Sequence, residues 1–295
     1  MDVEIKIQEP INRVTRKQKL KNYSKHPGSF LLALLTKLAI LLTVLALGFI
    51  LIYILVKGIP NLSTDLFALK YTTENVSMLP AIINTLMITL LSLCIAGPIG
   101  IFSAIYLVEY AKKGNKLVEV VRVTAETLTG IPSIVYGLFG MLFFVTTLKC
   151  GYSLLAGALT LSIMVLPVIM RTTEEALLAV PNSFREGSFG LGAGKLRTIF
   201  KIVLPSAVPG ILAGVILAIG RIVGETAALI YTAGTVAEIP SSIMSSGRTL
   251  AIHMYSLSKE GLYTNQAYAT AVVLLIVVVL INMLSNFVAK KFTKK

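Results

Sequence analysis

Charged side chains are scarce in this sequence, and their scarcity excludes a water-soluble globule. Lys, Arg, Asp and Glu make up 14% of the 295 residues, against about a quarter in average soluble domains. The two cysteines, Cys94 and Cys150, are too few for the disulfide framework of a small secreted protein. With 55% hydrophobic residues and a mean hydropathy of +0.82, the composition indicates an integral membrane protein.

Clusters of residues that carry catalysis or bind metal are also missing. The histidines, His26 and His253, are isolated from each other and show no metal-ligand spacing. The carboxylates are dispersed, whereas a membrane-embedded enzyme of lipid metabolism needs them gathered at the interface. No G-x-x-x-x-G-K-[ST] phosphate loop occurs. We therefore expect a chain that is not an enzyme and has no catalytic residue, cofactor or metal site of its own.

Long runs without charged residues predict six membrane-spanning helices. A helix that crosses the roughly 30 Å hydrocarbon core needs about 20 mainly apolar residues. The runs are 38–56, 81–108, 127–148, 150–170, 202–235 (interrupted twice) and 267–289. They are too long for buried core helices and lack the alternation of strands. The fold class is therefore all-α, a polytopic membrane helix bundle.

Lysines and arginines predict the orientation. If the N-terminus is cytoplasmic, twenty of the 27 fall on the cytoplasmic side, five fall outside and two lie within spans. This asymmetry follows the positive-inside rule and places both termini in the cytoplasm, in a cell membrane. It also accounts for most of the net charge of +13, so no nucleic-acid partner is expected.

These patterns divide the chain into five parts. The expected parts are a basic cytoplasmic tail (1–28), a first transmembrane helix (29–57), a five-helix transmembrane region (79–289), a cytoplasmic loop within that region (171–205) and a cytoplasmic C-terminal tail (290–295). The segment 236–266 is read as an external loop, which either meets an external protein partner or is simply solvated.

The long cytoplasmic loop contains two predicted helices. Ser183 and Glu186 have the spacing of a capping box, which predicts a short helix from Phe184. A second, amphipathic helix follows. Its apolar stripe consists of Leu196, Ile199, Phe200 and Val203, and its polar face of Lys195, Arg197, Thr198 and Lys201. The physics alone leaves two readings open, an interfacial helix on the bilayer or a docking element for a cytoplasmic partner.

Seven residues of this loop carry a resemblance. They are Glu186, Gly187, Ser188, Gly192, Ile202, Leu204 and Pro205. Their spacing resembles the EAA motif of binding-protein-dependent ABC importer permeases, with two small residues in place of the alanines. In that family the loop forms the coupling helix, which sits in a cleft of a separate ATPase subunit. The resemblance therefore implies docking to an ATPase on the cytoplasmic side.

A charged pair, Arg221 and Glu225, interrupts the fifth apolar run. Ionisable groups at membrane depth are costly and usually face a bundle interior or an aqueous cavity. Their i, i+4 spacing predicts that they share one helix face and pair. Gly210 and Gly214 lie on the same stripe, and small residues at this spacing indicate close helix contact. Two readings stay open: a structural ion pair, or a relay in which Arg221 attracts an oxyanion that Glu225 masks at rest.

Arg221 and the sequence Gly224-Glu225-Thr226-Ala227 resemble the signature of phosphate ABC importer permeases. The segment Ile131 to Gly140 resembles the third span of the same family, and the run from Thr249 to Ile281 is similar to the PstA-type subunit. The resemblance implies the type I ABC importer fold, with Arg221, Glu225 and Thr226 in the substrate path.

The implied partners are a PstC-type permease, two copies of a PstB-type ATPase that binds ATP and Mg²⁺, and an external PstS-type phosphate-binding protein. Three alternatives remain: a PstC-type subunit, a permease for another oxyanion such as phosphonate, or a purely structural membrane subunit.

Overall fold

The computed structural model describes residues 27–112 and 114–293, and every regular element in this part of the chain is a helix. The all-α prediction is therefore confirmed. Residues 1–26 of the expected N-terminal tail and 294–295 of the expected C-terminal tail lie outside the described residues, while 290–293 continue the last helix, α12 (Thr264–Thr293). The chain divides into two compact units, Met1–Ile54 and Leu55–Lys295.

The first unit contains most of helix α2 (Pro27–Gly58). The sequence of α2 is apolar all round, and its side chains up to Ile54 are exposed or half-exposed. A helix of this kind belongs in a lipid or protein environment. The last turn of α2 belongs to the second unit, where a Cβ on the buried Gly58 would overlap the backbone of Tyr268.

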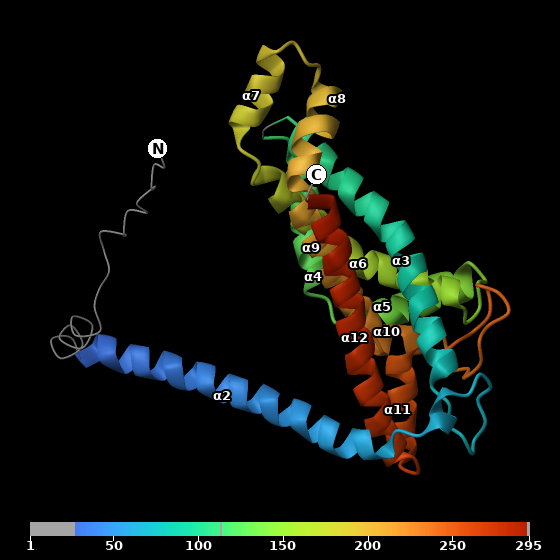
Figure 1. Cartoon of the computed structure of the whole chain (residues 1–295). Helices are drawn as coiled ribbons and strands as arrows, with labels where there is room; N and C mark the ends of the chain where they lie inside the picture. The colour runs from blue at the N-terminus through green and yellow to red at the C-terminus, as the bar shows by residue number, and fades with distance from the viewer. Residues whose placement is uncertain (1–26, 113, 294–295) are drawn as a thin grey trace, which may run out of the picture. The chain divides into compact units, whose positions relative to one another are not determined.

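The second unit is built around three long helices that pack in order (Figure 1). They are α3 (Leu79–Ile105), α6 (Leu154–Leu178) and α9 (Leu204–Val223). α6 contacts both others and is the most buried of the candidate spans. The prediction of close contact along the small-residue stripe of α9 is confirmed, because a Cβ on Gly210 would lie 2.6 Å from Ala176 Cβ and one on Gly214 would overlap Thr172.

The predicted third span is not one straight helix. The predicted segment 127–148 begins in the last turn of α4 (Lys116–Thr129) and continues after a break as α5 (Ser133–Gly140) and the π-helix η4 (Met141–Thr147), so α4 lies almost entirely outside it. The two halves meet at 103°, because Pro132 cannot continue the hydrogen bonding of α4. The Tyr136 hydroxyl donates to the Leu128 carbonyl at 2.7 Å and ties the halves together. The described residues thus contain five helices able to cross a membrane, or six if the bent pair is one span.

The remaining elements connect or extend these helices. They are η1 (Ile59–Asn61), η2 (Thr64–Phe67), η3 (Tyr106–Tyr110), α7 (Asn182–Gly190), α8 (Lys195–Thr198), η5 (Ile199–Val203), α10 (Ala227–Ile230), α11 (Leu250–Glu260) and α12 (Thr264–Thr293). The loop expected to begin at Arg171 begins only after Leu178. The segment 236–266 is not simply a solvated loop, because it contains α11 with a buried first turn.

Two apolar clusters organise the interior. The larger joins α3, α6, α9 and α10 through buried side chains such as Ile88, Leu161, Ile222 and Leu229. The second lies at the other end of α3 and α6, where Leu177, Ile199 and Val203 pack together. This second cluster joins the predicted coupling loop to the spanning helices.

Candidate functional site

Arg221 lies in the last turn of α9 and lines a pocket of about 530 Å³. Its side chain is half-buried. The other lining residues come from α6, α9 and α12: Val168, Ala213, Ile216, Leu217, Gly220 and Asn282. Apart from Arg221 and Asn282 these are apolar or glycine, so the guanidinium is the only charged group that the described residues contribute to this pocket. Asn282 was not singled out from the sequence, although a polar residue within the apolar run 267–289 was the available signal.

The predicted ion pair between Arg221 and Glu225 is wrong. Helix α9 ends at Val223 with Gly224 as its C-cap, so the i, i+4 geometry does not reach Glu225. Instead, Glu225 Oε1 accepts a hydrogen bond from the Ala228 amide at 3.1 Å, at the start of α10. Thr226 precedes α10 without capping it through its side chain. No ion pair of Arg221 occurs within residues 27–112 and 114–293.

The coupling-loop residues form a helical hairpin of α7 and α8. Gly192 has φ +80°, the left-handed conformation that glycine adopts at least cost, and turns the chain between the two helices. The buried hydroxyls of Ser188 and Thr198 lie 2.8 Å apart and join the helices. Thr198, which was predicted to lie on the polar face of the amphipathic helix, is therefore buried.

The predicted capping box of Ser183 and Glu186 is also wrong, because the helix begins earlier than expected. α7 begins at Asn182, directly after Pro181, and no side chain caps it. Proline is well suited to the start of a helix, and here it fixes the start early, so Ser183 already lies in the first turn.

The structure brings only some of the seven motif residues together. Ser188, Gly192 and Ile202 line a pocket of about 440 Å³. Glu186 and Gly187 lie on the exposed side of α7, while Leu204 and Pro205 begin α9.

The apolar stripe of the predicted amphipathic helix divides in two. Ile199 and Val203 are buried in the core, whereas Leu196 and Phe200 are exposed. Leu191, at the turn between α7 and α8, is 91% exposed. The hairpin thus presents apolar side chains that nothing in the described chain covers.

Arg185 anchors this hairpin to the spanning helices, a role that the sequence did not indicate. Its Nη2 lies 2.7 Å from Glu109 Oε1, and its Nε donates to the same oxygen at 3.1 Å. Nη1 donates to the Val180 carbonyl at 2.7 Å, and Nη2 to that of Leu177 at 2.9 Å. Arg185 and Glu109 are 76 residues apart, so no local spacing could have paired them.

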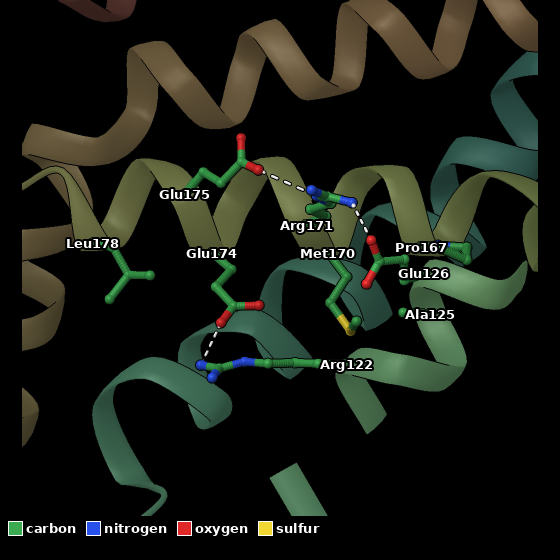
Figure 2. Close-up of a pocket in the computed structure, with 9 residues that line it drawn as sticks. All are labelled: Arg122, Ala125, Glu126, Pro167, Met170, Arg171, Glu174, Glu175 and Leu178. Atoms are coloured by element: carbon green, nitrogen blue, oxygen red, sulfur yellow. Dashed lines mark hydrogen bonds and ion pairs between the residues drawn. The ribbon is translucent and has the colours of Figure 1, made fainter. Parts of the chain in front are cut away.

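A second charged pocket, of about 320 Å³, lies between α4 and α6 (Figure 2). Arg122 Nη2 lies 2.5 Å from Glu174 Oε1. Arg171 Nε lies 3.2 Å from Glu175 Oε1, and Arg171 Nη1 lies 3.8 Å from Glu126 Oε1. Figure 2 shows that the pairs Arg122–Glu174 and Arg171–Glu126 join the two helices, whereas Arg171 and Glu175 both lie on α6. Since both arginines of this pocket are paired with carboxylates, which outnumber them three to two, the pocket holds no uncompensated positive charge.

No group of three or more His, Cys, Asp or Glu side chains that could hold a metal ion occurs among the described residues.

Residues 96–295 match the family described as the binding-protein-dependent transport system inner membrane component. The chain belongs to this family. It is therefore a permease subunit of an ABC transporter and not itself catalytic. The permease is 38% identical over 270 residues to the phosphate transport system permease protein PstA of Pasteurella multocida, covering 87% of this chain and 92% of that protein.

A second relative carries a less specific name. The permease is 32% identical over 261 residues to the probable ABC transporter permease protein YqgI of Bacillus subtilis, covering 82% of this chain and 88% of the relative. Among solved structures, a chain of a bacterial alginate ABC transporter superposes with a TM-score of 0.67 at 17% identity, over 92% of this permease and 98% of that chain. This likeness confirms the predicted fold.

Proposed function

We propose that this permease subunit forms, with a PstC-type permease, the pathway of an ATP-driven importer of inorganic phosphate. The observation that carries the proposal is Arg221, a half-buried guanidinium in an otherwise uncharged pocket, with no carboxylate partner among the described residues. A guanidinium binds a phosphate oxyanion through two parallel hydrogen bonds. The PstA name of several relatives supports phosphate as the substrate.

In this proposal Arg221 is available to the anion without first releasing a carboxylate. Glu225 is engaged at the start of α10 and does not mask the arginine at rest. Its charge lies a few residues away along the chain and disfavours permanent capture of phosphate. Thr226, half-buried beside it, lies in the same stretch of the path.

The other parts of the proposed assembly follow from the permease family and the charge pattern. Two copies of a PstB-type ATPase bind ATP and Mg²⁺ at the cytoplasmic side. A PstS-type binding protein delivers phosphate from outside. Both termini are cytoplasmic, in the cell or inner membrane. The hairpin of α7 and α8, with Glu186, Gly187, Ser188 and Gly192, transmits the movement of the ATPase to α9 through Ile202, Leu204 and Pro205.

The proposal is tested by Arg221→Gln and Arg221→Lys in cells that depend on this transporter for phosphate uptake. Glutamine removes the charge, so we expect uptake to fall at least about tenfold, the equivalent of roughly 1.4 kcal/mol of lost anion stabilisation. Lysine keeps the charge but lacks the planar fork, so an intermediate rate is expected. Membrane levels of the chain and of its partner permease are measured in parallel. Uptake at the wild-type rate in Arg221→Gln would overturn the role of Arg221.

Two further experiments, a comparison of substrates and a co-expression, separate the alternative functions. Uptake of phosphate is compared with that of methylphosphonate, and faster transport of the phosphonate would assign the permease to another oxyanion. The chain is also co-expressed with either a PstA-type or a PstC-type permease. Transport only with a PstA-type partner would identify this chain as the PstC-type subunit. A purely structural subunit predicts that Arg221→Gln changes assembly but leaves the flux per assembled complex unchanged.

A further inference from the structure

Arg248 is a buried arginine that is not among the residues lining the pocket of Arg221. It directly precedes Thr249, the N-cap of α11, and only 6% of its surface is exposed. Its guanidinium carbon lies 4.6 Å from the centroid of the Tyr71 ring, a cation–π contact. Its backbone amide donates to the Val236 carbonyl at 2.8 Å. The side chain is thus held in place by packing.

Several polar atoms around Arg248 have no partner. The guanidinium Nε and Nη2 make no hydrogen bond, and no ion pair of Arg248 occurs in the described part of the chain. The ring nitrogens of His253, which is fully buried, make no hydrogen bond to a side chain, and Asn84 Oδ1 and Thr249 Oγ1 have no partner. Buried polar groups are paired in the great majority of native structures. A cluster of unpaired groups around a buried charge therefore calls for a partner that the chain does not supply.

The imidazole of His253 adds hydrogen-bonding groups to this cluster without adding charge. Burial, followed by the nearby charge of Arg248, lowers the pKa of His253 to about 3, against the opposing effect of the Val76 carbonyl. At neutral pH the ring is therefore uncharged, with one nitrogen a donor and the other an acceptor. The edge of the ring faces Tyr71, with centroids 6.2 Å apart. Tyr71 and Arg248 are thus the other titratable groups against it, and neither brings a negative charge.

The backbone around the cluster is fixed. Asn84 Nδ2, on α3, donates to the carbonyls of Glu238 at 3.0 Å and of Arg248 at 3.2 Å. Thr85 Oγ1 accepts from the Leu250 amide at 2.8 Å. A Cβ on Gly247 would lie 2.8 Å from Asn84 Nδ2, so this approach requires glycine. The unpaired groups are therefore preorganised by contacts between α3 and the start of α11.

A buried guanidinium without a counter-charge is strongly unfavourable, whereas a charge that is paired and fully hydrogen-bonded is tolerated. We propose that Arg248 and His253 form a binding site for a small oxyanion, with inorganic phosphate as the natural candidate, distinct from the pocket of Arg221, while Asn84, whose amide group donates to two backbone carbonyls, holds the surrounding backbone in place. Small size follows from the burial of the guanidinium, because a carboxylate on the surface of another protein cannot reach it without opening the contacts of α3 and α11. The anion binds the free guanidinium edge, beside the uncharged imidazole.

The identity of the anion as phosphate rests on the proposed function. In the proposed orientation the start of α3 is external, so this site meets phosphate before Arg221 does. The existence of an oxyanion site does not depend on that orientation, because it follows from the unpaired groups alone.

The test uses the full-length chain purified together with its partner permease in phosphate-free detergent solution. Its melting temperature is measured against increasing inorganic phosphate, with sodium chloride at matched ionic strength as the control. A ligand that binds only the folded state raises the melting temperature. For wild type we expect a rise of roughly 3 °C at a tenfold excess over the dissociation constant. No rise in wild type beyond the chloride control would overturn the site.

Variants then assign the rise to one arginine. Arg248→Met should abolish it, Arg248→Lys should weaken phosphate binding about tenfold, and Arg221→Gln should retain at least part of it. If Arg248→Met does not fold, Arg248→Lys carries the comparison, because it keeps the charge and most of the packing. A rise that survives substitution of Arg248 but disappears in Arg221→Gln would overturn this inference while supporting the proposed function. A rise that depends on Arg248, together with phosphate uptake that is unchanged in Arg221→Gln, would support this inference and overturn the proposed function.

Discussion

Gly214 lies where α9 crosses α6, and it has no room for a side chain. A Cβ at this position would overlap Thr172 Oγ1 and lie 2.7 Å from Thr172 Cβ. Thr172 cannot rotate away freely, since its hydroxyl donates to the Val168 carbonyl at 2.8 Å. We therefore expect Gly214→Ala to push the two helices apart and to lower the free energy of unfolding by about 1–3 kcal/mol.

Gly220 provides the matched control on the same helix. A Cβ there meets nothing within 4 Å, so Gly220→Ala gains only the usual benefit of alanine in a helix, up to about 1 kcal/mol. Both variants are compared with wild type by denaturant-induced unfolding in mixed micelles. Equal effects of the two substitutions would show that helix contact at Gly214 does not contribute to stability.

The sequence predicted Arg221 in the candidate site but not its partners. Two charges four residues apart pair only if the helix continues through both, and here the helix ends at Val223. Gly224, a residue type common at helix ends, was the available signal. The cluster of Arg248 and His253 gave no signal, because burial of an isolated charge arises from the packing of α11 against α3 and leaves no local pattern.

At the scale of elements, the connection between α7 and the spanning helices depends on one arginine. The side chains of Arg185 and Glu109 are 15% and 9% exposed, so their ion pair is largely desolvated. Removing one member leaves the other charge without its partner in a buried place. We expect Arg185→Gln to lower the free energy of unfolding by about 3 kcal/mol and to reduce phosphate uptake per ATP hydrolysed, since α7 then moves without α3.

Arg171 is the control for this prediction. It also makes two ion pairs, but its side chain is 57% exposed and those of its partners, Glu126 and Glu175, are 73% and 66% exposed. Exposed pairs contribute little, so Arg171→Gln should cost less than about 1 kcal/mol. Unfolding of both variants is measured in the same micelles. A double variant with Glu109→Gln should recover part of the loss at Arg185, and simple additivity would contradict a direct coupling.

Hydropathy predicted which segments are long and apolar enough to span a membrane, but not where the helices bend or end. Runs of apolar residues mark membrane segments because the hydrocarbon core admits few others, and this held for α2, α3, α6, α9 and α12. Hydropathy does not record where a chain turns, so the 103° bend between α4 and α5 was missed although Gly130 and Pro132 mark it. The last predicted residues of the fifth span, 224–235, belong instead to α10 and the turns around it.

For the whole molecule, the sequence motifs predicted the family from the coupling loop and the surroundings of Arg221, and the comparisons confirmed it. A different feature of the structure, its exposed apolar side chains, bears on the contacts with partner chains. Apolar side chains are exposed at both ends of the second unit, including Leu191 between α7 and α8 and Leu262 between α11 and α12. The proposed assembly places an ATPase at only one of these ends.

This difference gives a prediction with an internal control. Leu191 is 91% exposed and Leu262 is 82% exposed, so glutamate at either position should leave the fold and the melting temperature of the permease unchanged. A glutamate at the centre of an apolar docking surface has to be desolvated without a partner. We therefore expect Leu191→Glu to abolish co-purification of the ATPase from membranes, and Leu262→Glu to retain it at the wild-type level. Retention of the ATPase by both variants would place the docking surface away from the α7–α8 turn, and loss in both would show that assembly fails for a reason other than this contact.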